Sequence, residues 1–225
     1  MKPILSCRKL SKSYKSPKPV ELFSNIDLDV YPEDTLAIVG RSGEGKSTLL
    51  HLLGILDTPT AGEITLLGET ASYEDHEKRN KHIGFIFQQF HLLEDYTVID
   101  NVLMPAYIAR KPTHQKSAAF KRAQELLERV GLLSHQFHLA KHLSGGEKQR
   151  VAIARAFLND PDIILADEPS GNLDHATAQS IHQLLLDFAK ESNKACIIVT
   201  HDLSFAKLCA RQYLLSGGTI GPLEN

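Results

Sequence analysis

A lysine and three hydroxyl residues stand in a glycine-rich segment early in the chain. Residues 40–48 read GRSGEGKST and fit the pattern GxxxxGK[ST]. Glycines let a loop wrap around phosphates, so that backbone N–H groups and the following helix N-terminus face the anion. Lys46 supplies positive charge to the β- and γ-phosphates, and Ser47 offers a hydroxyl to Mg²⁺. The candidate nucleotide-binding residues here are Gly40, Arg41, Ser42, Gly43, Glu44, Gly45, Lys46, Ser47 and Thr48.

The surroundings of this segment decide between a phosphate loop and a glycine-rich turn that binds nothing. The continuous apolar run 35–39 (TLAIV) predicts a buried central strand, and 48–53 (TLLHLL) predicts a helix. A phosphate loop requires a strand before it and a helix after it. The sequence therefore favours nucleotide binding.

A second group of candidate residues follows another apolar run. Residues 162–166 (DIILA) predict a buried strand, and Asp167 and Glu168 stand at its carboxyl end. Ligands of open α/β sheets bind beyond that edge. Asp167 is suited to hold Mg²⁺ and Glu168 to polarise an attacking water. In isolation, the pair also fits an acidic helix start before Pro169.

The elements that must position these residues alternate between strands and helices, which is typical of an α/β fold. Residues 25–30 alternate polar and apolar side chains and predict a half-exposed strand. Further strands are expected at 63–67, 83–87 and 196–200. Helical periodicity dominates from about 98 to 157, with one helix ending at Gly131. We expect one domain, 1–225, with an inserted helical subdomain at about 91–158.

Composition excludes several classes of protein. The chain has 225 residues and 25 Lys+Arg against 27 Asp+Glu, so it lacks the basic excess of a dedicated nucleic-acid binder. No apolar run approaches the roughly 20 residues that span a bilayer. The apolar stretch before Cys7 is far shorter than a signal peptide needs. We therefore expect a cytosolic protein that does not bind nucleic acid.

Residues 143–150 (LSGGEKQR) carry a family resemblance. The string resembles the LSGGQ signature of ATP-binding-cassette (ABC) ATPases and precedes the acidic pair at that family's spacing. Ser144 can cap the helix that follows, where free N–H groups form an anion site. A plain capped helix start does not explain the whole string. The resemblance implies that Ser144, Gly145 and Gly146 face the γ-phosphate held by the opposite subunit of a head-to-tail homodimer.

The same resemblance assigns further residues. Tyr14 lies where the family stacks an aromatic ring on adenine, although an isolated tyrosine there is more often packing. Gln88 matches the glutamine that reaches Mg²⁺ and the attacking water, and Gln89 leaves that register open by one. Residues 170–174 (SGNLD) match the segment ending in Asp174, which joins the ATP site. The implied catalytic residues are Glu168, His201 and Gln88, and the implied Mg²⁺ ligands are Ser47, Gln88 and Asp167.

The resemblance implies an ABC ATPase fold: a P-loop NTPase with a RecA-like core, an N-terminal antiparallel β subdomain and the helical insertion. Within the family, residues 50–54 (LHLLG) and 56–62 (LDTPTAG) are similar to the ATPases that power lipoprotein release. This implies a peripheral protein on the cytoplasmic face of the inner membrane. Its partners would be permease subunits that dock near Gln88–Tyr96, where Phe90, Leu92, Leu93 and Tyr96 make the surface apolar.

Two departures from the group pattern and three alternative functions remain open. Glu44 replaces a small residue of the phosphate loop, and Ser170 stands where the group has threonine. We expect nucleotide binding to survive Glu44, although an acid near phosphates weakens binding. The alternatives are a macrolide-efflux or cell-division ATPase of the same group, a soluble ABC ATPase acting on DNA or ribosomes, and a small-molecule kinase. The kinase has no use for residues 143–150.

Overall fold

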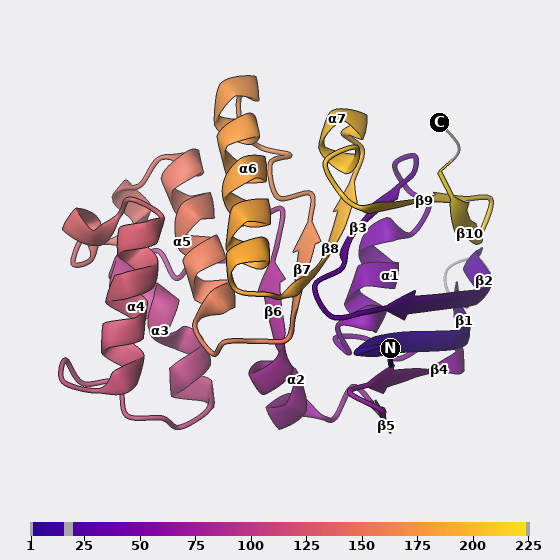
Figure 1. Cartoon of the computed structure of the whole chain (residues 1–225), viewed down its shortest axis with the longest axis horizontal. Coiled ribbons are helices and arrows are strands. Elements are labelled where there is room, and N and C mark those ends of the chain that lie inside the picture. Colours follow the sequence, from indigo (N-terminus) through magenta and orange to yellow (C-terminus); the bar gives the residue numbers. More distant parts are fainter. Residues whose placement is uncertain (1, 16–19, 224–225) are drawn as a thin grey trace. The chain divides into compact units, whose positions relative to one another are not determined.

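The computed structural model describes residues 2–15 and 20–223 and divides into two compact units. Unit 1 extends to His76 and resumes at Asn193, while unit 2 runs from Glu77 to Ser192. Figure 1 shows the elements of both. No helix within the described residues is long and apolar enough to cross a membrane.

Unit 1 holds two sheets. Its elements are β1 (Leu5–Tyr14), β2 (Val20–Val30), β3 (Thr35–Val39), α1 (Lys46–Leu53), β4 (Ala61–Leu66), β5 (Glu69–Thr70), β8 (Ala195–Thr200), α7 (Leu203–Ala206), β9 (Arg211–Ser216) and β10 (Thr219–Pro222). The antiparallel sheet has the order β2-β1-β4-β5. In the other sheet β3 lies between β8 and β9 and is parallel to both, while β9 and β10 are antiparallel.

The strand predictions for this unit are confirmed, with longer bounds for β2. Alternation in β2 places Ile26, Leu28 and Val30 in the core and leaves Asp27 exposed, as a half-exposed strand requires. By contrast, the last four residues of β3 are all buried, as expected for a strand covered on both faces. β3 therefore enters the phosphate loop from a fixed position.

Unit 2 combines two parallel strands with a helical block. Its elements are α2 (His76–His82), β6 (Ile83–Ile86), α3 (Val98–Ile108), α4 (Ala118–Arg129), the 3-10 turns η1 (Leu133–His135) and η2 (Ala140–His142), α5 (Gly145–Phe157), β7 (Ile163–Asp167) and α6 (His175–Glu191). β6 pairs with β7, and α3, α4 and α5 pack on one another (Figure 1).

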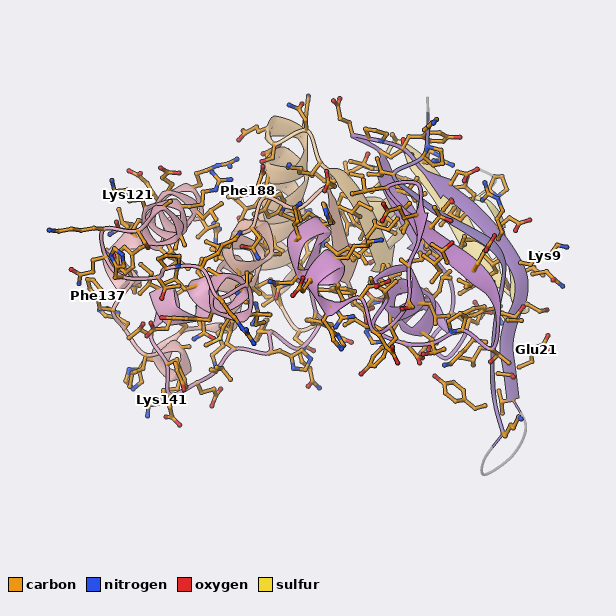
Figure 2. All side chains as sticks on the ribbon, turned by 90° about the horizontal axis from the view of Figure 1, so that it is seen from below. Lys9, Glu21, Lys121, Phe137, Lys141 and Phe188 are labelled. Atoms are coloured by element: carbon orange, nitrogen blue, oxygen red, sulfur yellow. The ribbon has the colours of Figure 1, made fainter. Side chains whose placement is uncertain are left out.

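Local chemistry sets the helix bounds in unit 2. Ser117 caps the N-terminus of α4 by accepting from the Phe120 N–H, and Gly131 follows the helix with φ of +76°. The predicted end at Gly131 is thus confirmed. The ring centroids of Phe188 in α6 and Phe157 in α5 lie 5.1 Å apart, so these two helices pack through their aromatic side chains. In Figure 2, Phe188 lies within this unit while Phe137 and Lys121 lie at its rim.

Candidate functional site

The phosphate loop of unit 1 has the backbone that its glycines predict. It joins β3 to α1, and Gly43 and Gly45 adopt φ of +85° and +90°. L-residues with a side chain rarely adopt such angles. A Cβ on Gly45 would also lie 3.3 Å from Leu22 Cβ and from ring atoms of Phe23. The backbone conformation therefore favours glycine at this position, and the space for a side chain is tight.

Lys46 is the first residue of α1, and its side chain is held inside the loop. The residue is only 7% exposed, and its Nζ donates to the Arg41 carbonyl oxygen over 3.0 Å. A phosphate oxygen is a charged acceptor and forms a stronger bond with an ammonium than a carbonyl does. Lys46 is therefore positioned to exchange a neutral acceptor for a phosphate. Ser47 follows it in the first turn of the helix.

Glu44 has two partners that the sequence did not suggest. Its Oε2 accepts from the Arg41 N–H over 2.8 Å, and its Oε1 accepts from Ser216 Oγ in β9 over 3.4 Å. The carboxylate therefore bonds to the loop and to the neighbouring strand.

Two other predicted residues of unit 1 lie outside the loop. Tyr14 ends β1 and is 44% exposed, with Lys12 Nζ 5.1 Å from its ring centroid. His201 follows β8 and is exposed; the next residue, Asp202, caps α7. An exposed ring at Tyr14 is available for stacking, whereas a packing residue would be buried.

In unit 2, Asp167 and Glu168 follow the expected buried strand. Asp167 is the last residue of β7 and is 8% exposed. Glu168 has φ of +43°, so the chain turns sharply at this residue. The pair is not the start of a helix, because α6 begins at His175 and is capped by Asp174. The helix-start alternative is thus wrong, and Glu168 lies on a turn beyond the strand.

Side chains of the turn that carries Glu168 form hydrogen bonds with distant segments of unit 2. Asn172 Nδ2 donates to the Gln88 carbonyl oxygen over 3.1 Å, which brings the predicted glutamine to this turn. Ser170 Oγ lies 2.6 Å from Nε2 of His182, a residue of α6 that is only 4% exposed. The serine that departs from the group pattern therefore has a buried partner.

Ser144 caps α5 as predicted, and a further residue completes the cap. Ser144 Oγ accepts from the Glu147 N–H, and Glu147 Oε2 accepts from the Ser144 N–H over 2.8 Å. The Ser144 hydroxyl and backbone bonds lower the pKa of the Glu147 carboxyl. This capping box was missed, although the spacing S-x-x-E at 144–147 predicts it.

The signature glycines lie close to the segment that ends in Asp174. A Cβ on Gly146 would approach Thr177 Cγ2 within 2.7 Å, and one on Gly145 would lie 3.3 Å from Leu173. Asp174 accepts from the Thr177 N–H over 3.0 Å and from its hydroxyl, and these bonds lower the pKa of the aspartate. Unit 2 thus brings residues 144–146 and Asp174 together.

An apolar groove of about 250 Å³ lies elsewhere in unit 2. Its lining includes Phe85 and Phe87, whose rings stack at 5.2 Å, and Met104 and Ile108 of α3. Arg155 also lines it and donates to the carbonyl oxygens of Phe90 and His91 over 2.8 and 2.6 Å. Burial lowers the pKa of this arginine to about 10. His91 lines the groove and also belongs to the predicted docking surface Gln88–Tyr96. Two apolar residues of that surface, Leu93 and Tyr96, are 44% and 51% exposed.

Comparisons with known proteins agree with this geometry. The sequence pattern of the family described as "ABC transporter" matches residues 23–171. The chain is 49% identical over 218 residues to the lipoprotein-releasing system ATP-binding protein LolD of Protochlamydia amoebophila, covering 96% of both chains. It is 47% identical over 224 residues to LolD of Pseudomonas syringae pv. tomato, covering 97% of both.

Solved structures are similar over nearly the full length. The dimeric structure of MJ0796, a bacterial ABC transporter cassette, has a TM-score of 0.87 and 36% identity, covering 98% of this chain and 99% of that one. A dimeric post-hydrolysis state of MJ0796 bound to ADP and Pi has a TM-score of 0.85 and 35% identity, with the same coverage. The predicted fold class is confirmed.

Proposed function

The chain belongs to the ABC transporter family, and from that premise we propose that it powers the release of lipoproteins from the inner membrane. It is an ATPase of the cassette type. The near-full-length similarity to LolD proteins carries the proposal, because motifs of the ABC family alone would fit transporters of many substrates. We further propose that residues 1–225 form one nucleotide-binding domain with a helical subdomain at about 91–158. Residues 1, 16–19 and 224–225 of this domain lie outside the described residues.

In this proposal the phosphate loop binds the nucleotide. Lys46 exchanges the Arg41 carbonyl for the β- and γ-phosphates, and the backbone N–H groups of residues 40–48 other than that of Arg41 surround the anion. Tyr14 offers its exposed ring to adenine.

The residues present suit Mg²⁺ as the cofactor of the reaction. Ser47, Gln88 and Asp167 offer a hydroxyl, an amide oxygen and a carboxylate, which are the hard oxygen ligands this ion takes. Asp167 is the last residue of β7, so its carboxylate stands at the carboxyl end of a buried strand. When bound, the ion would neutralise phosphate charge.

Glu168 is the residue that we assign to the attacking water. It lies on a turn immediately after β7, with φ of +43°, and so beyond the carboxyl end of the strand. There it would accept a proton from the water as a general base. His201 would contact the γ-phosphate, and Gln88 would orient the water.

We propose that two copies assemble head to tail and that Ser144, Gly145, Gly146 and Asp174 bind the nucleotide held by the partner copy. The dimeric MJ0796 cassettes support this arrangement. ATP binding would close the dimer and hydrolysis would reopen it, so the nucleotide biases a two-state element.

The permease partners, of the LolC and LolE kind, would bind at the apolar groove and the neighbouring surface Gln88–Tyr96. The groove suits an apolar helix, because stacked Phe85 and Phe87 line it beside Met104 and Ile108. Binding there would place this chain at the cytoplasmic face of the inner membrane as a peripheral protein.

The test is a pull-down of tagged Glu168→Gln protein from native membranes in the presence of ATP. Recovery of two different permeases with bound lipoproteins supports lipoprotein release. Recovery of one permease type with a periplasmic adaptor or a regulator of cell-wall hydrolases would replace it with efflux or signalling. Lys46→Ala serves as the control. Because this variant should not bind ATP, it should not recover partners that require the ATP-bound state.

A further inference from the structure

The acid of the phosphate loop, Glu44, makes contacts that a residue supplying only its backbone would not need. It stands between Gly43 and Gly45, which adopt φ of +85° and +90°. Its Oε2 bonds back to the Arg41 N–H over 2.8 Å. This hydrogen bond closes a ring that runs from Arg41 through Ser42 and Gly43 to the Glu44 side chain.

A second bond ties the same carboxylate to the adjacent sheet. Oε1 accepts from Ser216 Oγ over 3.4 Å, and Ser216 ends β9, the strand beside β3. Oε2 also lies close to Gly40, since a Cβ built there would be 2.9 Å from it. The carboxylate thus spans from the first residue of the loop to β9.

The side chains of Glu44 and Lys46 bond to different groups of Arg41, and the Glu44 backbone N–H also donates to the Arg41 carbonyl over 3.4 Å. Lys46 Nζ donates to the Arg41 carbonyl, while Glu44 accepts from the Arg41 N–H. When Lys46 turns to a phosphate it gives up the carbonyl, but the bond from the Arg41 N–H to Glu44 is unaffected. A restraint on the loop therefore persists when the lysine is in use.

We propose that the Glu44 carboxylate is a positioning group that holds the phosphate loop in its binding conformation. This rests on the proposed nucleotide site. Charge alone gives the opposite expectation, because an anion near phosphates repels them. Salt screens this repulsion, because the Debye length at physiological ionic strength is about 8 Å. A hydrogen bond to a charged acceptor is worth about tenfold in the equilibrium between the ordered and the open loop, less for this half-exposed side chain. We expect this restraint on the loop to outweigh the screened repulsion.

The experiment compares ADP affinity of the full chain and its variants, using ADP with a fluorescent ribose label. ADP lacks the γ-phosphate, so binding reports on the loop and not on dimer closure. Glu44→Ala should bind ADP about three- to fivefold more weakly. Glu44→Gln keeps an acceptor oxygen and loses the charge, so it should stay within about twofold of wild type. Hydrogen exchange of a peptide covering residues 40–49 should be faster in Glu44→Ala than in Glu44→Gln.

The two variants also separate this proposal from its alternatives. If Glu44→Ala and Glu44→Gln both bind ADP more tightly than wild type, Glu44 acts by repulsion and the proposal is wrong. Unchanged affinity and exchange in Glu44→Ala would also overturn it. Ser216→Ala loses only the longer bond and should change affinity less than Glu44→Ala. If wild type binds ADP and Lys46→Ala does not, the proposed nucleotide site is supported even if Glu44 has no effect. If wild type does not bind ADP, both the nucleotide site and the role of Glu44 are wrong.

Discussion

The phosphate loop of unit 1 and the Glu168 turn of unit 2 are held in place by different sets of hydrogen bonds. Each must hold an irregular backbone at the end of a buried strand. In the loop, Glu44 and Lys46 both bond to Arg41, three and five residues away, and one longer bond joins Glu44 to Ser216 of β9. The turn has local backbone bonds from Gly171 to Glu168 and from Leu173 to Ser170, and its side chains also bond to distant residues: Ser170 to the His182 ring and Asn172 to the Gln88 carbonyl.

This difference predicts how each region responds to mutation. A loop restrained from within should lose nucleotide affinity when its own residues change. A turn restrained from α6 and from the segment at Gln88 should lose turnover when a distant partner changes, with nucleotide affinity intact.

Glu168→Gln should reduce ATP turnover by about 10²–10⁴-fold, because the amide cannot accept a proton from the attacking water. Nucleotide affinity should remain, since the phosphate loop is unchanged. Phosphate release and labelled-nucleotide binding measure the two effects on the same preparation. Normal hydrolysis in this variant would remove Glu168 from its assigned role.

Lys46→Ala should weaken ADP and ATP binding by about 10–100-fold, because it deletes the charged donor to the phosphates. The Arg41 carbonyl also loses the 3.0 Å bond from Nζ, so the loop itself loosens. Binding is measured by titration with labelled nucleotide. An unchanged affinity would show that residues 40–48 are not the phosphate site, and the division between loop and turn would fail with it.

Much of this arrangement could be predicted from the sequence because it depends on local rules. The run 35–39, the glycines 43 and 45 and the cap at Ser144 each act within a few residues, and each is where the pattern placed it. The anchors of the Glu168 turn could not be predicted in the same way. Ser170 and His182 are separated by twelve positions across a helix start. Only the folded chain brings them within hydrogen-bond distance.

Ser170→Ala removes the hydroxyl that meets His182 and should lower ATP turnover about three- to tenfold while leaving ADP affinity unchanged. The expected cause is a loosened turn two residues after Glu168, which misplaces the carboxylate. Ser170→Thr retains the hydroxyl and should restore most of the turnover. If both variants hydrolyse ATP at the wild-type rate, the distant anchor does not position Glu168. A loss of ADP affinity in Ser170→Ala would contradict the division between the two regions.

The cap of α5 tests whether unit 2 also contains local restraints. Ser144→Ala should destabilise the protein by about 1 kcal/mol, as expected for a lost helix cap. For a chain of this size, that lowers the thermal midpoint by about 2–4 °C. Differential scanning at matched pH measures it, and an unchanged midpoint would show that the cap contributes nothing.

The charge of Glu147 adds a pH dependence whose sign follows from its lowered pKa. A carboxyl with a lowered pKa contributes stability above its ordinary value of 4.5, and loses it as pH falls through the lowered one. Glu147→Gln preserves a capping-box side chain without that charge. Wild type should therefore be more stable than Glu147→Gln at pH 7, by no more than about 0.5 kcal/mol in a half-exposed site, and should have the higher thermal midpoint; the two should converge at acid pH. A difference that grew on acidification would mean that Ser144 does not stabilise the ionised form.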